Sequence, residues 1–343
     1  MHGLNNPKTV DDVLAAIDAT VLKRGIANVI FHPQEWLRSE QLVHVVDRIQ
    51  EKYGKRVKFL TFGECINRIN QHLLLGQPIR ADKGGDNGVR MIDLNSDGFL
   101  DVLIGNENRQ IVRLWQPEKG AWLDSDSLLQ FTRNSASGER IDLGVKFGFL
   151  TRSKNVCAIV NNEIEKAVYE FKNGRFVKHP LPQPLANIAT SVQGKDQGVR
   201  LRDLNNDGVS EILAANPKRR ALWMLEESRW TEVEAGMPAA IVDEQGRDNG
   251  VRFADIDQDG FVDLVVSNER RSAVYLYEPD TRGFTKQVTG AGRIPPIVRD
   301  GQNNGAWFAD EHLWLQNERT NRRPDGMDRR SFAQLRGNTE PKP

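Results

Sequence analysis

The nine-residue stretch DIDQDGFVD, residues 255–263, decides how the rest of the chain is interpreted. Carboxylates stand at its first, third, fifth and ninth positions, and glycine stands at its sixth. Ca²⁺ prefers about six to eight oxygen ligands, which a tight loop supplies from alternate side chains and from the backbone carbonyl of the seventh residue. Glycine at the sixth position allows the sharp turn that brings the later oxygens around the ion. The stretch therefore predicts a calcium-binding loop.

The residues that follow this loop predict a strand. An EF-hand would carry a bidentate glutamate at the twelfth position and would then enter a helix. Here the twelfth position is Val266, and residues 261–266 read FVDLVV, which is rich in β-branched side chains. The loop is therefore expected to connect two β-strands.

The same pattern occurs twice more, as DLNSDGFLD at 93–101 and as DLNNDGVSE at 203–211. Each of the three copies follows a Gly-Val-Arg triplet and precedes an apolar stretch that ends near an asparagine. An ordinary turn also favours Asp, Asn and Gly, but it needs no carboxylate at the ninth position. The shared spacing therefore favours three metal loops over three plain turns.

The spacing of the copies predicts further units. They begin at residues 93, 203 and 255, so the first interval is about twice the second, and a hidden unit should start near residue 144. Residues 144–157 read GVKFGFLTRSKNVC, whose ligand positions, 149, 151, 153 and 157, carry Phe, Thr, Ser and Cys. These cannot hold calcium. A fifth unit starts near residue 304, with the loop between its first two strands deleted.

Each unit also contains two later strand-like stretches, for example residues 273–277 and 284–288. Four antiparallel strands per roughly 50 residues are typical of a β-propeller blade. Aromatic residues recur at the last hairpin of the units, and we interpret them as packing between blades rather than as a sugar platform. The predicted fold is mainly β, a propeller of about five visible four-stranded blades with a small N-terminal α/β segment.

Residues 84–320 resemble FG-GAP or VCBS repeats, the calcium-loop blades of integrin α-subunit propellers and of many secreted proteins. The resemblance implies that an ion in each loop stiffens its blade. The implied ligands, loop by loop, are Asp93, Asn95, Asp97, the Phe99 carbonyl and Asp101; Asp203, Asn205, Asp207, the Val209 carbonyl and Glu211; and Asp255, Asp257, Asp259, the Phe261 carbonyl and Asp263. With four carboxylates against three, the third loop is predicted to bind most tightly. Propellers of this family usually have more blades, so the sequence does not decide whether the ring closes.

Residues 1–78 predict alternating helices and strands, with strands over 27–31 and 57–60. Two strands are too few for a covered parallel sheet. The segment either packs on the rest of the chain or is the tail of a larger α/β domain whose beginning is missing, and we favour the second interpretation. The predicted domains are this segment, a propeller over 79–320 and a polar tail over 321–343, which includes a weak helix over 327–335.

Residues 29–33 and 57–64 resemble the C-terminal end of a polysaccharide deacetylase domain, a distorted (β/α) barrel. The resemblance implies that His32 corresponds to the catalytic acid of that family. The Asp-Asp pair and the His-x-x-x-His metal motif of the family do not occur upstream of it. Because general acid catalysis needs its partners, the alternative interpretation of His32 is a strand-end histidine with a structural hydrogen bond.

Composition excludes some classes of function. Lysine and arginine total 47, as do aspartate and glutamate, so net charge gives no sign of a nucleic acid or anionic membrane partner. The two cysteines, Cys65 and Cys157, indicate neither a disulfide framework nor a zinc site. No apolar run reaches the roughly 18 residues of a membrane span, and residues 1–7 lack the apolar core of a signal peptide.

The sequence therefore predicts a calcium-binding propeller that acts as a non-catalytic binding module, with a protein or carbohydrate ligand at its loops. The alternative is the C-terminal part of a carbohydrate deacetylase that carries the propeller as an accessory module, and a third possibility is a structural spacer. Calcium loops of this kind suit the millimolar calcium outside cells. We expect an extracellular, cell-surface or periplasmic protein.

Overall fold

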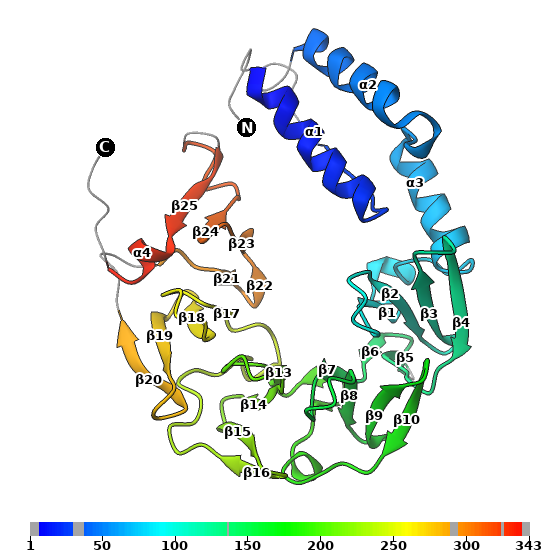
Figure 1. The fold of residues 1–343 in the computed structure, drawn as a ribbon. Coiled ribbons are helices and arrows are strands. Elements are labelled where there is room, and N and C mark those ends of the chain that lie inside the picture. The colour runs from blue at the N-terminus through cyan, green and yellow to red at the C-terminus, as the bar shows by residue number, and fades with distance from the viewer. Residues whose placement is uncertain (1–6, 30–37, 136, 289–293, 324–325, 338–343) are drawn as a thin grey trace. The chain divides into compact units, whose positions relative to one another are not determined.

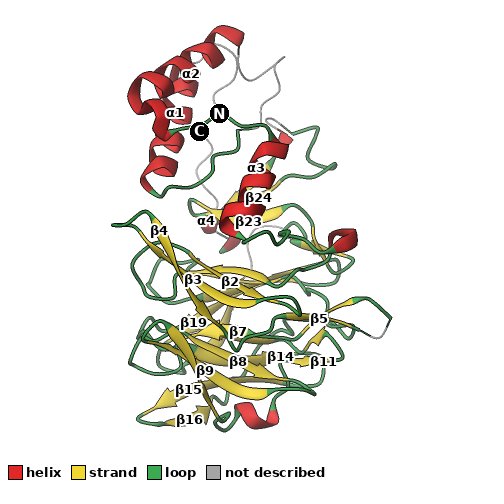
Figure 2. Cartoon of the chain, turned by 90° about the vertical axis from the view of Figure 1, so that its right-hand side faces the viewer, coloured by secondary structure: helices red, strands yellow, loops and turns green. Residues whose placement is uncertain are grey.

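The computed structural model describes residues 7–29, 38–135, 137–288, 294–323 and 326–337 (Figure 1). The chain divides into two compact units, Met1–Pro78 and Ile79–Pro343. Figure 2 distinguishes the helices of the first unit from the strands that build the second.

The first unit contains helices α1 (Pro7–Leu22), α2 (Ser39–Tyr53) and α3 (Phe62–Arg68), with short 3₁₀ and π-helical turns at Gly54–Arg56 and Ile69–Leu73. A small core joins α1 to α2, and its buried members are Val10, Leu14, Val45 and Ile49. Because these residues recur at helical spacing, each helix buries one face against the other. Helix α3 starts with a capping box in which Thr61 and Glu64 bind each other's backbone N–H groups.

The strands expected in this unit differ from the structure. Residues 57–60 form no strand, and the side chains of Phe59 and Leu60 are 50% and 39% exposed. Residues 27–29 are also irregular, while residues 30 and 31 and His32 lie outside the described residues. A strand needs a partner for its backbone hydrogen bonds, and the described part of this unit contains helices only. Apolar β-branched composition alone therefore did not produce a sheet here.

The second unit contains the blades, each an antiparallel sheet whose strands follow one another in the sequence. The first two blades comprise β1 (Val89–Ile92), β2 (Asp101–Gly105), β3 (Gln110–Gln116) and β4 (Ala121–Asp126), then β7 (Lys146–Gly148), β8 (Cys157–Asn161), β9 (Lys166–Lys172) and β10 (Arg175–His179). The next two comprise β13 (Val199–Arg202), β14 (Glu211–Ala215), β15 (Arg220–Glu226) and β16 (Arg229–Glu232), then β17 (Val251–Ala254), β18 (Asp263–Ser267), β19 (Ser272–Glu278) and β20 (Gly283–Val288). The fifth comprises β23 (Ala306–Ala309), β24 (His312–Leu315) and β25 (Asp328–Ser331). The prediction of a propeller with five visible blades is confirmed.

Short hairpins lie between successive blades. They are formed by β5 (Thr132–Asn134) with β6 (Arg140–Asp142), by β11 (Ser191–Val192) with β12 (Lys195–Asp196), and by β21 (Val298–Arg299) with β22 (Gln302–Asn303). Two 3₁₀ turns, Asp82–Gly84 and Leu185–Asn187, complete this unit together with helix α4 (Phe332–Leu335).

The fifth blade takes its third strand from the stretch predicted to be a polar tail. Strand β25 pairs antiparallel with β24, with Arg329 opposite Trp314. A weak helix was expected over residues 327–335, but only α4 is helical, beginning after the capping residue Ser331. Strand β24 supplies hydrogen-bond partners for β25 that local propensity does not anticipate.

The second strand of a blade is its most buried element. All five residues of β2, β8, β14 and β18 are buried. Both faces of these strands pack against apolar side chains, so their sequences are nearly continuous apolar runs rather than alternating patterns. The stretch Leu264–Val266 in β18, for example, is 0% exposed throughout.

Apolar clusters connect each blade to the next. Leu103 of blade one and Ala158 of blade two belong to one cluster, and Ile159 of blade two and Ile212 of blade three to another. Leu213 of blade three shares a cluster with Leu264 of blade four, and Val265 of blade four shares one with Leu313 of blade five. Some aromatic residues of the last hairpins enter these clusters: Phe171 and Phe176 lie in the cluster of blades one and two, and Tyr277 and Phe284 in that of blades three and four. Trp115 and Trp122 of blade one instead pair with each other, with ring centroids 4.9 Å apart.

Candidate metal sites

The three acidic loops occupy the same place in three blades. They join the first and second strands, β1 to β2, β13 to β14 and β17 to β18. Their backbones also agree at two positions. The fourth residue has a left-handed conformation, with φ of 58° at Ser96, 59° at Asn206 and 64° at Gln258. The sixth residue is a glycine with φ of 82°, 85° and 90° in chain order.

The glycine at the sixth position is needed for its backbone conformation. A Cβ atom added to Gly260 would meet nothing within 4 Å, so space does not exclude a side chain there. Its φ of 90° is a conformation that other residues rarely adopt. The turn brings the Gly260 N–H to the Asp255 carboxylate, at 3.0 Å, and the equivalent bonds in the other two loops are each 2.9 Å.

The ninth carboxylate is the anchor of each loop. Asp263 is 0% exposed and accepts hydrogen bonds from the backbone N–H groups of Ile256 and Tyr277, both at 2.8 Å. Asp101 accepts the corresponding pair from Leu94 and Trp115, both at 2.9 Å. In blades four and one the ninth residue therefore ties its loop to the third strand of the same blade. In blade three Glu211 accepts the N–H of Leu204, the second residue of its loop, at 2.6 Å.

Burial makes the negative charge of these anchors costly. Burial, followed by the charges of Asp257 and Asp259, raises the pKa of Asp263 to about 6 despite the two backbone hydrogen bonds. Burial also raises the pKa of Glu211 to about 8, with contributions from Asp207 and Asp203. A cation in the loop would remove this cost by stabilising the ionised carboxylates.

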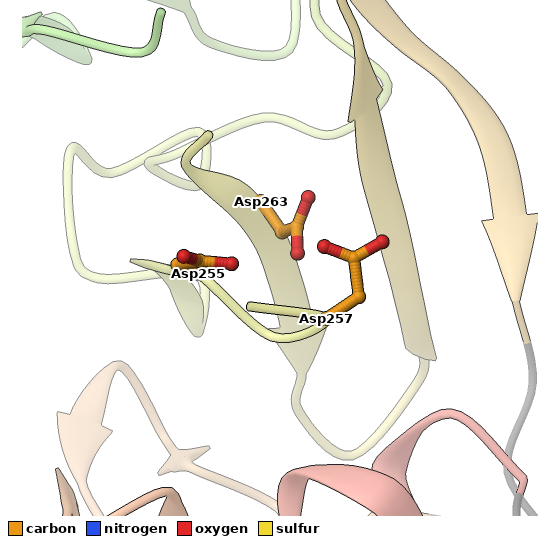
Figure 3. A group of neighbouring side chains, drawn as sticks. All are labelled: Asp255, Asp257 and Asp263. Atoms are coloured by element: carbon orange, nitrogen blue, oxygen red, sulfur yellow. The ribbon is translucent and has the colours of Figure 1, made fainter. Parts of the chain in front are cut away.

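The blade-four loop holds the most compact group of carboxylates. One ligand oxygen each of Asp255, Asp257 and Asp263 lies within 4.8 Å of the other two, and Figure 3 shows the carboxyl groups of Asp257 and Asp263 facing each other. The Oδ1 atom of Asp257 is buried and has no hydrogen-bond partner. A buried polar oxygen without a partner is rare, and three converging carboxylates with such an oxygen fit a divalent cation.

The third position differs in the other two loops. There an asparagine donates its Nδ2 hydrogen to the fifth carboxylate, from Asn95 to Asp97 at 3.0 Å and from Asn205 to Asp207 at 3.3 Å. These amides satisfy part of their hydrogen bonding within the loop. The amide oxygens of both asparagines also accept the backbone N–H of the fifth residue, at 3.3 and 3.1 Å.

Blade two retains the loop without its ligands. Lys154 takes the sixth position with φ of 57°, and the hydroxyl groups of Thr151 and Ser153 lie 2.7 Å apart. The buried Cys157 replaces the ninth carboxylate, and burial raises the pKa of its thiol although the Leu150 backbone donates a hydrogen bond to it. This loop keeps the anchoring contact and contains no carboxylate.

Sequence reasoning missed the third-strand residues that hold the ninth carboxylates. Trp115 and Tyr277 each follow their carboxylate by 14 positions. In blade two Phe171 stands 14 positions after Cys157, and its N–H instead donates to the Val156 carbonyl. A spacing of 14 positions between the ninth loop residue and an aromatic residue, shared by blades one, two and four, was therefore the available signal; blade three has Leu225 at this position. In the part of the chain that the structure describes, no helix has the length and apolar character of a membrane span.

Comparisons with known proteins bear on the propeller. Residues 203–266 match the family described as FG-GAP-like repeat. No curated protein sequence matches the chain. A solved lectin structure from Agrocybe aegerita, titled for recognition of non-reducing terminal N-acetylglucosamine, is 14% identical over 76% of this chain and 71% of its own, with a TM-score of 0.46. A Tc holotoxin pore from Photorhabdus luminescens is 18% identical over 71% of this chain and 11% of its own, with a TM-score of 0.43. The chain thus contains a segment matching FG-GAP-like repeats within a five-bladed β-propeller.

Proposed function

We propose that the propeller binds Ca²⁺ in its three acidic loops and acts as a non-catalytic binding module. The observation that carries the calcium assignment is the buried, unpartnered Asp257 Oδ1 beside the oxygens of Asp255 and Asp263. Carboxylate and amide oxygens are the ligands that Ca²⁺ prefers. The common backbone of the three loops extends the assignment to blades one and three.

The proposed ligands are those at the first, third, fifth and ninth positions of each loop, with the carbonyl of the seventh. In blade four the ion would be held by Asp255, Asp257, Asp259, the Phe261 carbonyl and Asp263. In blade three these are Asp203, Asn205, Asp207, the Val209 carbonyl and Glu211, and in blade one Asp93, Asn95, Asp97, the Phe99 carbonyl and Asp101.

A binding role follows from what calcium would do to the scaffold. An ion fixes loops that would otherwise hold mutually repelling carboxylates, and rigid loops present a ligand surface at low entropic cost. We propose a protein or carbohydrate ligand at the propeller loops and an extracellular, cell-surface or periplasmic location, where calcium is abundant. The deacetylase alternative rests on the resemblance of residues 29–33 and 57–64 alone, and no contact in the described residues favours it.

Calorimetric titration of Ca²⁺ into metal-free protein tests the proposal. We expect binding at three loops, with the blade-four loop tightest because it carries four carboxylates. Asp259→Ala should remove the site that binds Ca²⁺ most tightly, and Asp97→Ala should remove a weaker site. Ser153→Ala, the same position in the loop without ligands, is the matched control and should change nothing. An absence of binding heat would overturn the calcium assignment, and equal losses in the two aspartate variants would overturn the ranking.

A further inference from the structure

The loops of blades three and four are joined directly by a backbone hydrogen bond. The N–H of Val262, at the eighth position of the blade-four loop, donates to the carbonyl of Leu204 at 2.9 Å. Leu204 is the second residue of the blade-three loop, and its own N–H donates to Glu211 at 2.6 Å. A displacement of either loop is therefore transmitted to a group that holds the other.

Tyr277 forms a second connection between the same two loops. Its backbone N–H holds Asp263, and its ring lies 5.7 Å from that of Phe261, the seventh residue of the blade-four loop. Its side chain then continues into blade three, where the hydroxyl lies 3.9 Å from the sulfur of Met224. The residue is only 2% exposed. Burial and the charge of Glu211 raise the pKa of Tyr277 to about 12, as expected for a hydroxyl near the blade-three carboxylates.

The blade-one loop has a different neighbour. The next loop along the propeller is that of blade two, residues 149–157, which carries no carboxylate. This loop is in turn bonded to blade three, because the Ser210 N–H donates to the Phe149 carbonyl at 2.6 Å. A loop without ligands therefore stands in sequence order between the blade-one site and the other two.

From these contacts we propose that the loops of blades three and four bind calcium as a cooperative pair, while the blade-one loop binds independently. This inference rests on the proposed calcium function. When an ion orders the blade-four loop, it fixes Val262, Phe261 and Asp263, and through them Leu204 and Tyr277. The second ion then binds a loop whose backbone is already ordered, so less ordering entropy opposes it. Tyr277 and Phe261 act here as positioning residues.

The test uses the full chain in an Asp97→Ala background, in which two sites remain. Calcium titrations are compared for this protein and for versions that also carry Asp259→Ala, leaving blade three, or Asp207→Ala, leaving blade four. We expect each isolated site to bind at least about fivefold more weakly than in the pair. A two-site isotherm equal to the sum of the isolated sites would overturn the cooperativity while leaving calcium binding intact. Absence of binding in the unmodified protein would instead overturn the proposed function, and the inference with it.

A second pair of variants locates the coupling. Phe261→Ala removes the ring that contacts Tyr277 but keeps the backbone carbonyl, and it should reduce the fivefold enhancement to less than about twofold. Phe253→Ala is the matched control, because it removes the same ring from the same interface between blades three and four, at a position outside the loop. It should lower the melting temperature and keep the enhancement. Equal loss of the enhancement in both variants would assign the effect to general packing and overturn the role of Phe261 and Tyr277.

Discussion

At the scale of single residues, the third position of each loop separates the blade-four site from the other two. Asn95 and Asn205 each have an amide that pairs with the fifth carboxylate, whereas Asp257 brings another negative charge. Burial, then the charges of Asp259 and Asp255, raises the pKa of Asp257. The ionised carboxylate of Asp257 therefore destabilises the metal-free protein, whereas it would stabilise a bound cation.

This balance predicts opposite effects of Asp257→Asn with and without calcium. The asparagine can donate to Asp259, as in the other loops, so the metal-free protein should gain about 1 kcal/mol of stability. In calcium the variant should be less stabilised than the unmodified protein, because one charged ligand is lost. Chemical unfolding in chelator and in calcium measures both effects. A loss of stability in chelator would contradict the prediction.

The sixth position of the loops can be tested by two opposite substitutions, glycine to a larger residue in blade four and a larger residue to glycine in blade two. Gly260→Ala places a side chain at φ of 90° and should cost about 1–2 kcal/mol. Lys154→Gly, at the same position of the blade-two loop, relieves a left-handed lysine and should raise stability by up to about 1 kcal/mol. Both are measured by unfolding in chelator, so that calcium affinity does not contribute. Changes of the same sign in the two variants would refute the conformational explanation.

At the scale of elements, the hairpin of β11 and β12 is tied by one carboxylate to the first strands of two blades, β7 and β13. Asp196 accepts from Lys146 of blade two at 3.3 Å and from Arg200 of blade three at 2.8 Å. It also accepts the Gly198 N–H at 2.8 Å. Burial alone would raise the pKa of Asp196, but Lys146, Arg200 and this N–H lower it below its usual value.

Because the pKa of Asp196 is lower in the folded protein, its contribution to the free energy of unfolding is sensitive to acid. This contribution is fully present above the unfolded-state pKa of 3.8 and is lost as the pH falls from there through the folded-state pKa. Asp196→Asn should therefore cost about 2 kcal/mol near neutral pH, because it leaves two cations with a neutral partner. Its difference from the unmodified protein should shrink below about pH 3.8. Unfolding at neutral and acid pH measures this, and a difference that grows in acid would contradict the assignment.

At the scale of the whole molecule, the second unit is a series of blades joined by apolar clusters. Three of the blades carry acidic loops. Calcium bound only by the folded loops should stabilise this unit by mass action. One site at a calcium concentration of about 100 times its Kd contributes about 2.7 kcal/mol. For a unit of this size that corresponds to a rise in melting temperature of at least about 5 °C.

Thermal unfolding with calcium and with chelator, followed by the strand signal in circular dichroism, checks this prediction. The helical first unit serves as an internal reference, because its described residues contain none of the acidic loops. Its transition should not respond to calcium. If the melting temperature of the strand signal is the same with calcium and with chelator, the propeller fold stands and the proposed calcium binding is contradicted.

Much of the propeller could be predicted from the sequence, because the features that encode it are local. The Asp, Asn and Gly spacing sets the loop turn, and its period locates the blades, including blade two, where Phe149 and Cys157 stand at the positions of candidate ligands. The candidate ligands follow from the same nine-residue pattern. The first unit was predicted less well, since residues 57–60 have strand composition but form no strand among the described residues.

The sequence by itself determined the repeat, the turn at Gly260 and the set of candidate oxygen ligands, since these depend on residues within one loop. Only the tertiary structure decided which groups hold Asp263, that Val262 bonds to Leu204, and that β25 completes the last blade. Those contacts join residues that are far apart in the chain or in different blades. Local propensity carries no information about such partners, because burial and strand pairing are settled by whatever surface the folded chain brings alongside.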